Sequence, residues 1–353
     1  MTVTPDIRAE ADRLRASFEA KGAESFETAI LQPAGTLLNL YGEDIRARAF
    51  VTQDPLRGEM MLRPDFTVPL VQSHIASGAT NARYTYAGEV FRRQEDDETR
   101  PTEYLQVGFE VIGHDSGRAA EINADAEVFT TISNALDGLP VEATIGDFNV
   151  LTAAILDLDT PKRRKDALLR HLWRPVRFRA LLDRFSKPAP PLPDPIGINT
   201  PHVGLRSPME VEARLALLAE EQSTPPLKAS EVDRIMALLD VKATAPDAVR
   251  AIKSIAAGDT DVLNAARVIE DLLDVLAENG TDPGALGFEA SYGLTSLEYY
   301  TGFVFGFSAP DLPVVATGGR YDMLTAALSG GKRIPAIGGV IRPDAVLAVR
   351  AAT

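Results

Sequence analysis

The sequence predicts an α+β fold in which a sheet is flanked by helices and a helical insertion interrupts the second half of the chain. Two strand-like arms joined by a polar loop occupy residues 83–112, whereas residues 149–286 are helical and rich in Ala and Leu. Proline-rich breaks at 187–201 and 223–227 interrupt these helices, because proline cannot continue a regular helix. We therefore expect a first part of the core over residues 1–159, a helical insertion over 160–226 and a second part of the core over 227–353.

The order of the predicted elements follows from hydrophobic periodicity and from turn residues. An N-terminal amphipathic helix carries Ile7, Leu14 and Phe18 on one stripe. Asp65 lies at a turn just before an apolar helix, where a carboxylate caps the helix N-terminus. The other predicted elements are strands over Ser25–Leu31, Arg46–Gln53, 141–147, 286–306 and 313–316, helices over Val68–Ile75, 118–137 and 230–279, and a strand with a terminal helix over 333–350.

The second arm of residues 83–112 has one face that suits a small polar ligand. Side chains alternate across a strand, so its apolar residues point one way and its other residues point the opposite way. The apolar set is Leu105, Val107, Phe109 and Val111, and the opposite set is Tyr104, Gln106, Gly108 and Glu110. Gln106 and Glu110 then present an amide and a carboxylate on one face of the strand, while the opposite face packs against the core. A half-buried strand with one solvated side explains the same alternation.

Composition narrows the class of partner and the compartment. The chain has 36 basic and 50 acidic residues and a net charge of −14, which disfavours nucleic acid because Lys and Arg supply most of that affinity. The absence of cysteine excludes disulfides and zinc–thiolate sites. With no apolar run of about 18 residues and no signal-peptide pattern, we expect a cytoplasmic protein without a membrane span. Metal-ligand spacing is absent from the four histidines, so neither a metal nor a cofactor is expected: His74, His114, His171 and His202.

Five segments, taken in order, resemble the core of class II aminoacyl-tRNA synthetases and of histidyl-tRNA synthetases in particular. They are LRPDFT (62–67), YAGEVFRRQ (86–94), RPTEYLQVGFEVIG (100–113), SLEYYTGFVF (296–305) and TGGRYD (317–322). The resemblance covers most of the chain apart from its middle region. It implies a mostly antiparallel sheet and a dimer formed through the segment around Phe26–Leu40. Within TGGRYD, Gly318 and Gly319 are expected to let the backbone turn tightly beneath a pocket.

The resemblance also implies a histidine pocket. Carboxylates accept hydrogen bonds from an ammonium group and from an imidazole N–H, whereas an amide and phenols fix the orientation of the ring. In the synthetases, the arginine that matches Arg92 grips the α-phosphate, and a tyrosine pair closes the pocket around the imidazole. Taken alone, a Tyr-Tyr pair before alternating phenylalanines is explained as well by packing. The expected histidine-binding residues are Asp65, Thr67, Arg92, Arg100, Gln106, Glu110, Tyr299 and Tyr300.

Two departures from the synthetase pattern remove cations that would face the reacting phosphorus. The catalytic arginine specific to histidyl-tRNA synthetases falls on Thr295, and the ATP-holding arginine of the closing motif falls on Ala345. Losing one preorganised donor costs about 3–4 kcal/mol of transition-state stabilisation, so we expect negligible adenylation. Arg342 precedes Pro343, which fits the first turn of a helix, so this arginine is expected outside that helix. Four carboxylates at residues 95–98 are poor neighbours for phosphate, although a solvated acidic loop is the commoner explanation.

These departures resemble the non-catalytic relatives of the synthetases, the regulatory subunits of ATP phosphoribosyltransferase. Only eight residues follow Ala345, which leaves no room for an anticodon-binding domain. The resemblance implies a chain without catalytic activity that pairs with a short-form catalytic subunit, forms a homodimer within a hetero-octamer and mediates feedback by histidine in histidine biosynthesis. Two alternatives are an enzyme that still activates histidine with ATP and a paralogue with another ligand. The sequence leaves open whether histidine binds in the pocket or at a subunit boundary.

Overall fold

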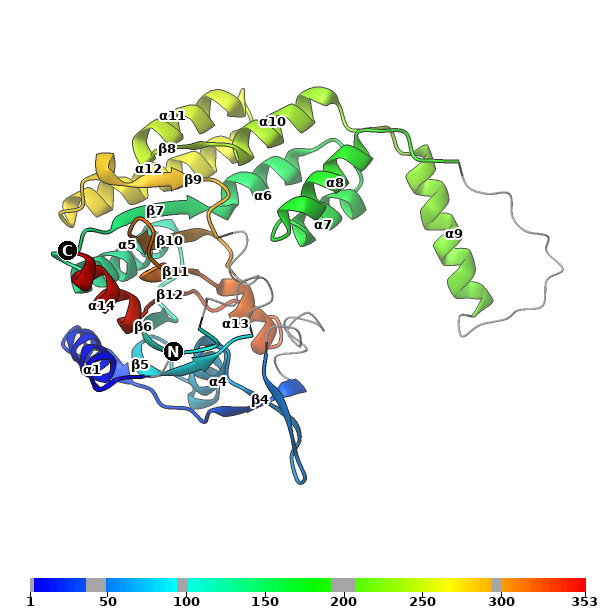
Figure 1. The fold of residues 1–353 in the computed structure, drawn as a ribbon. Helices are drawn as coiled ribbons and strands as arrows, with labels where there is room; N and C mark the ends of the chain where they lie inside the picture. Colours follow the sequence, from blue (N-terminus) through cyan, green and yellow to red (C-terminus); the bar gives the residue numbers. More distant parts are fainter. Residues whose placement is uncertain (1–2, 36–48, 94–100, 192–206, 294–299) are drawn as a thin grey trace.

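The computed structural model describes residues 3–35, 49–93, 101–191, 207–293 and 300–353. Within these residues, a nine-stranded sheet forms the centre of the molecule and a three-stranded sheet lies beside it (Figure 1). In spatial order the large sheet contains β1 (Glu24–Ser25), β5 (Ala82–Phe91), β6 (Glu103–Ile112), β12 (Ala336–Ile341), β11 (Ala316–Arg320), β10 (Phe303–Ser308), β7 (Glu142–Asp147), β9 (Gly287–Glu289) and β8 (Lys242–Thr244). The small sheet contains β2 (Leu31–Pro33), β4 (Gly58–Leu62) and β3 (Val51–Asp54).

The large sheet is mostly antiparallel, as predicted. Among the described strands only β1 pairs with β5, and β7 with β9, in parallel. The two arms of residues 83–112 form the long antiparallel pair of β5 and β6, from Ala82 opposite Ile112 to Phe91 opposite Glu103. On its other side β6 pairs with β12, close to the C-terminus of the chain. This pairing gives Glu110 a glycine, Gly338, as its direct neighbour across the sheet.

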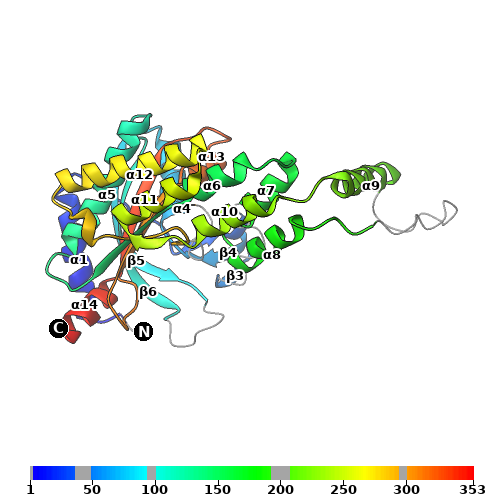
Figure 2. The same ribbon diagram turned by 90° about the horizontal axis from the view of Figure 1, so that it is seen from above.

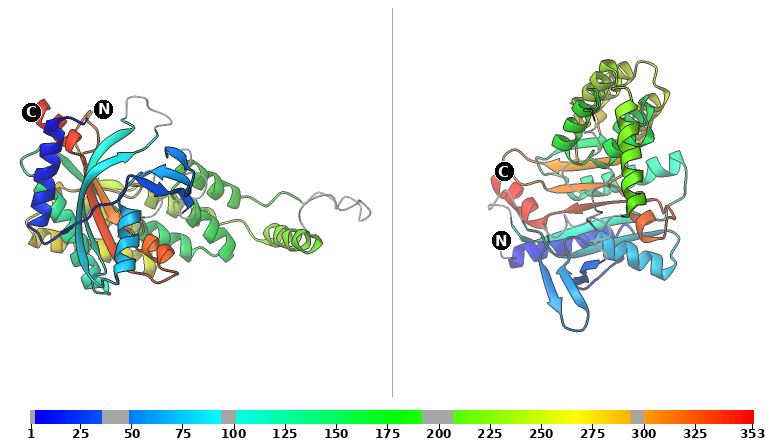
Figure 3. Two further views of the ribbon diagram at one scale, coloured as in Figure 1. Left: turned by 90° about the horizontal axis from the view of Figure 1, so that it is seen from below. Right: turned by 90° about the vertical axis from the view of Figure 1, so that its right-hand side faces the viewer.

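One face of the large sheet carries the main aromatic core. Phe109 of β6 lies 5.5 Å from Phe18 of the first helix, and Phe305 of β10 lies 5.4 Å from Phe129, measured between ring centroids. Figure 3 shows α1 and α14 on this side of the sheet and α4 and α13 on the other. The helices on the core side are α1 (Pro5–Glu19), α5 (Arg118–Ala135) and α14 (Pro343–Ala352). Four more helices pack around the far end of α5: α6 (Phe148–Asp157), α10 (Ala229–Leu239), α11 (Ala245–Ala256) and α12 (Thr260–Glu278). A short 3₁₀ turn (Pro283–Ala285) precedes β9.

The opposite face is covered by α4 (Thr67–Ser77), by the residues that lead into it and by α13 (Asp322–Leu328). The ring of Phe66, just before α4, stacks on Tyr86 of β5 with centroids 4.3 Å apart. Gln106 and Glu110 are only 4% and 2% exposed. A strand with one solvated side is therefore wrong for β6, because the chain buries both of its faces.

Most of the elements predicted from the sequence are present, but several differ. The strand predicted over 286–306 is wrong, since β9 ends at Glu289, a turn follows and β10 begins only at Phe303. The short strand β8 interrupts the helices predicted over 230–279. Ser25–Leu31 is not one strand, since β1 ends at Ser25 and β2 begins at Leu31. The strand predicted over 313–316 begins only at its last residue, Ala316. The turn expected at Gly318 is wrong as well, because it and Gly319 lie inside β11, paired with β10 and β12.

Between residues 160 and 226, the described part of the chain contains three helices, α7 (Lys162–Arg170), α8 (Pro175–Phe185) and α9 (Pro208–Ser223). Helix α8 and the turn before it pack on the core, where Trp173 meets Phe148 with ring centroids 4.4 Å apart. Figure 2 shows that α9 extends beyond α7 and α8 at the far end of the molecule. In the described part of the chain, no helix combines the length and the apolar character needed to cross a membrane.

Candidate functional site

Glu110 is the centre of a buried polar cluster on the face of the sheet opposite α5. The hydroxyl of Tyr86, on β5, donates to Glu110 Oε1 at 2.9 Å, and that of Tyr321 donates to Oε2 at 2.7 Å. The neighbouring strands make room for these groups with glycine. A Cβ atom at Gly338 would lie 1.4 Å from Glu110 Oε2, and one at Gly108 would lie 2.1 Å from Tyr86 Cζ. The cluster therefore requires glycine at both positions, because any side chain there would collide with it.

The environment of Glu110 raises its pKa from 4.5 to about 7. Burial is the main cause, because it penalises the charged carboxylate, and the negative charge of Asp65 acts in the same direction. Hydrogen bonds from Tyr321, Tyr86 and Thr67 favour the carboxylate and limit the shift. A carboxyl group with a pKa near 7 is poised to lose its proton when a cationic or N–H-bearing ligand arrives.

Replacing Glu110 with Gln is expected to flatten the pH dependence of stability. Since the folded pKa exceeds that of the unfolded chain, the folded protein holds the proton more tightly between pH 4.5 and 7. The contribution of Glu110 to the free energy of unfolding therefore falls by about 3 kcal/mol as the pH rises through this window. Urea unfolding of wild type and Glu110→Gln at pH 5 and pH 8 checks this. A difference in unfolding free energy that stays constant between the two pH values would contradict it.

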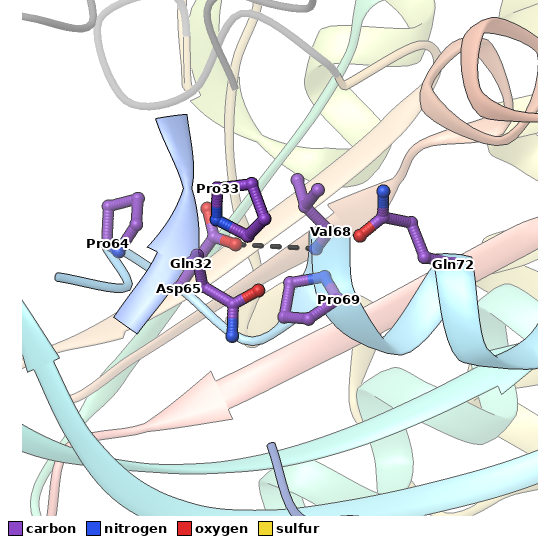
Figure 4. Close-up of a pocket in the computed structure, with 7 residues that line it drawn as sticks. All are labelled: Gln32, Pro33, Pro64, Asp65, Val68, Pro69 and Gln72. Carbon is purple, nitrogen blue, oxygen red and sulfur yellow. Dashed lines mark hydrogen bonds between the residues drawn. The ribbon is translucent and has the colours of Figure 1, made fainter. Parts of the chain in front are cut away.

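Asp65 and Thr67 approach Glu110 from the start of α4. Asp65 Oδ1 accepts a hydrogen bond from Val68 N at 3.4 Å, so its carboxylate lies at the N-terminus of α4 as predicted, although the N-cap residue is Phe66. Burial raises the pKa of Asp65, whereas the charge of Arg92 and the backbone N–H groups of residues 67 and 68 lower it. Figure 4 shows Asp65 at the wall of a small cleft of about 10 Å³, beside Pro33 and Gln72.

Arg92, Gln106 and Tyr300 surround the same cluster. Arg92 Nε donates to Pro64 O at 2.8 Å, which ties the end of β5 to the segment before α4. Burial raises the pKa of Tyr300, and the charge of Glu110 raises it further, whereas the charge of Arg92 lowers it. The amide of Gln106 makes no hydrogen bond to another described residue although it is 4% exposed. A buried amide without a protein partner is available to a ligand.

Of the eight predicted histidine-binding residues, the structure therefore brings six to one face of the sheet around Glu110. The other two, Arg100 and Tyr299, lie outside the described residues, as do Thr295 and the acidic run at 95–98. Sequence reasoning missed Tyr86 and Tyr321, whose hydroxyl groups donate to Glu110. A signal for them exists in the glycines at alternate positions of neighbouring strands, which leave space for large side chains.

The closing motif lies where β12 passes into α14. Ala345 is buried in α14, and Arg342 lies at the N-cap of that helix, outside it as predicted. Its guanidinium nevertheless reaches toward β6, where it lies 4.6 Å from the ring centroid of Tyr104. Arg342 Nη2 also donates to Asp344 Oδ2 at 2.6 Å, so its charge is paired within the chain.

A second buried network lies on the α5 face, beneath Tyr321. Arg320 is 4% exposed, and its Nη2 donates to Asp125 Oδ1 at 2.6 Å and to Glu121 O at 2.9 Å. Burial raises the pKa of Asp125 to about 7, and Arg320 opposes this shift. The backbone carbonyl oxygen of Arg320 accepts a hydrogen bond from Thr301 N at 2.8 Å. Arg320 thus anchors both Tyr321, its neighbour in the chain, and the strand entry that carries Tyr300.

The chain matches known proteins over nearly its whole length. A family model described as histidyl-tRNA synthetase matches residues 5–178 and 210–346. An ATP phosphoribosyltransferase regulatory subunit of Sinorhizobium medicae is 30% identical over 363 residues, covering 94% of this chain and 95% of the relative. One of Brucella anthropi is 29% identical over 355 residues, covering 92% of this chain and 93% of the relative.

Solved structures agree on the fold. A Bacillus halodurans protein described as an ATP phosphoribosyltransferase regulatory subunit/histidyl-tRNA synthetase aligns with a TM-score of 0.69 at 22% identity, covering 99% of this chain and 81% of that one. A histidyl-tRNA synthetase from a Nostoc species aligns with a TM-score of 0.65 at 16% identity, covering 98% and 72%. With its class II synthetase-like sheet and these full-length relatives, the chain belongs to the family of ATP phosphoribosyltransferase regulatory subunits, which has the histidyl-tRNA synthetase fold.

Proposed function

We propose that this chain binds free histidine in the cluster around Glu110 and uses it to regulate a separate catalytic subunit of ATP phosphoribosyltransferase, without forming bonds itself. The observation that carries the proposal is the buried carboxyl of Glu110, held between two tyrosine hydroxyls at 2.9 and 2.7 Å. Its carboxylate would accept the imidazole N–H of histidine. Gln106 stands on the same face of β6, about 13 Å along the strand, and its amide would meet the amino-acid end of the ligand.

The loss of phosphate-binding cations supports a receptor rather than an enzyme. The position of the ATP-holding arginine is the buried methyl group of Ala345. Arg342 reaches the same face of the sheet, but its pairing with Asp344 opposes the binding of a nucleotide phosphate. Because preorganised cations supply much of the stabilisation of a phosphoryl transition state, adenylation by this chain would be slow.

Regulation would follow from unequal histidine affinity in two quaternary states. A ligand shifts an equilibrium only by its difference in affinity for the two states, typically 1–3 kcal/mol for regulatory coupling. The pocket combines residues from β5, β6, β11 and the start of α4, so a small movement of α4 against the sheet would change its shape. A self-association through the segment around Phe26–Leu40 fits the exposed Ile30 and Leu31, each 42% exposed, although residues 36–40 lie outside the described chain.

Histidine binding to the isolated chain is expected to release a proton at pH 6 and less at pH 8. At pH 6 Glu110, with a pKa of about 7, is protonated and must ionise to accept the ligand. Calorimetric titrations in two buffers of different ionisation enthalpy measure the released proton. Glu110→Gln is the matched control: it should bind at least tenfold more weakly and lose this part of the proton release. Equal binding by wild type and variant would place histidine elsewhere, at a subunit boundary for example.

The enzymatic alternative has its own test. We expect no histidine-dependent exchange of pyrophosphate into ATP above background, and we expect a short-form catalytic subunit to gain phosphoribosyltransferase activity when this chain is added. Appreciable exchange would establish a synthetase-like activity. A chain that binds another amino acid in preference to histidine would instead be a paralogue with a different ligand.

A further inference from the structure

Helix α9 is an apolar helix that its own chain leaves uncovered. None of its 16 residues is buried. Met209, Val211, Leu215 and Leu217 are 76%, 40%, 50% and 39% exposed. Isolated helices of this length are marginal in water, and most helices in proteins are stabilised by packing an apolar stripe. The sequence therefore carries a packing surface that the single chain does not use.

That surface has a defined shape and charge. Val211, Leu215 and Leu218 recur at spacings of four and three residues, which places them on one stripe of the helix. The helix carries four glutamates and one arginine, so the stripe lies in an acidic surround. Of these glutamates, Glu212 and Glu220 form no ion pair with any described residue. A matching surface would be apolar and basic.

Helix α8 supplies such a surface, since it carries three basic residues and one acidic residue. On α8, Val176 is 84% exposed, and Ala180 lies one turn further on the same exposed side. Arg177 and Arg184 border this apolar strip. Within the described chain Arg177 has no ion-pair partner. The exposed strip of α8 is thus complementary to the stripe of α9 in both hydrophobicity and charge.

In one chain the two surfaces do not meet. Only the last turns of α9 are held by α7, where Arg164 Nε donates to Glu221 Oε1 and Arg163 Nη1 donates to Leu217 O, both at 3.0 Å. Beyond these contacts α9 points away from α8 (Figures 1 and 2). The connection that follows contains Pro225 and Pro226 and is fixed at Leu227, whose N–H donates to Phe185 O at 2.8 Å. An extended proline connection hinders the arm from folding back onto its own α8.

We propose that α9 is an exchanged arm: in a pair of chains, the Val211–Leu215–Leu218 stripe of each α9 packs on the Val176 and Ala180 strip of the partner's α8. The arrangement is self-complementary, because each chain presents one acidic arm and one basic strip, and a two-fold axis satisfies both at once. A 16-residue helix is about 24 Å long and spans the whole of the 11-residue α8. The occupant is a second copy because α8 is the described surface that matches α9 in charge.

Disulfide trapping tests this directly, because the chain has no cysteine of its own. A tagged Leu215→Cys chain and an untagged Val176→Cys chain are mixed, oxidised and separated without reduction. The expected product is a linked pair that contains one chain of each kind. Met323→Cys, at a 65% exposed position on α13, replaces Leu215→Cys as the control and should not link to Val176→Cys.

Charge reversal gives a second measurement that does not depend on folding defects. Arg177→Glu in the Val176→Cys chain should slow linkage two- to five-fold, and Glu212→Arg in the Leu215→Cys chain should restore it. The proposal is overturned if Leu215→Cys links only to itself, if a Leu215→Cys/Val176→Cys double variant closes within single chains, or if linkage forms only when the catalytic subunit is present. Failure of histidine to bind would leave this result untouched, because the arm and the pocket are separate surfaces.

Discussion

Replacing Arg320 with Met is expected to lower the free energy of unfolding by about 3–5 kcal/mol, the largest stability effect that the structure predicts for one residue. The guanidinium is 4% exposed and joins Asp125 of α5 to Asp322 at the start of α13. Methionine fills a similar volume but leaves Asp125 without its cation, whereas Asp322 keeps its pair with Arg333. Removing one member of a buried pair costs more than the pair contributes, because the remaining charge stays buried. Urea unfolding at pH 7 measures the loss.

The pH dependence of this loss separates electrostatics from packing. The pKa of Asp125 is already raised to about 7 with Arg320 present, and it rises further when the opposing cation is removed. A folded pKa above the unfolded value means that stability falls as pH rises, so the deficit of Arg320→Met should be larger at pH 8 than at pH 5.5. Arg250→Met, which breaks an exposed pair with Asp247, is the control and should cost less than about 1 kcal/mol. An equal deficit at both pH values would assign the effect to packing alone.

Replacing Gly338 with Ala is expected to weaken histidine binding by more than tenfold and to cost about 1–3 kcal/mol of stability. The new methyl group would lie 1.4 Å from Glu110 Oε2 and 2.2 Å from its Cδ. Glu110 must then leave its position between Tyr86 and Tyr321, and the proposed acceptor for the imidazole moves with it. Calorimetric titration with histidine and urea unfolding of the same preparation measure the two effects.

Two further variants locate the cause of this effect. Gly287→Ala, in β9, adds a methyl group that makes only ordinary contacts, 3.4 Å from Thr144 Oγ1, so it should leave both quantities nearly unchanged. Adding Glu110→Asp to Gly338→Ala shortens the carboxylate side chain by one methylene group and should recover part of the stability. If Gly338→Ala binds histidine as tightly as wild type, the pocket around Glu110 is not where the ligand lies.

The sequence was sufficient for features that depend on local pattern. Alternation in Leu105 to Val111 predicted which side chains share a face of β6, and the turn before α4 predicted that the carboxylate of Asp65 would lie at the N-terminus of that helix. Periodicity likewise predicted α5 and α14. In each case, neighbours within a few residues decide the conformation, so short-range rules apply.

What the sequence could not predict depends on which distant strands become neighbours. Glu110 meets Gly338 only because β6 pairs with β12, more than two hundred residues away in the chain. Tyr321 reaches Glu110 for the same reason, from the end of β11. Gly318 and Gly319 looked like a turn because glycine favours turns, whereas in β11 they make room for Phe305 and for Val304 and Tyr300. Burial of both faces of β6 also needs α4, whose docking no local pattern specifies.

The glycines on the Glu110 side of β6, β11 and β12 limit how the proposed histidine pocket could change its specificity. Each of these walls is peptide backbone, so even the smallest substitution adds a methyl group where a tyrosine ring or a carboxylate already stands. Single replacements at these glycines therefore cannot reshape the pocket step by step. A descendant that recognises a differently shaped amino acid has to change a wall position and the facing side chain together, for instance Gly108 with Tyr86.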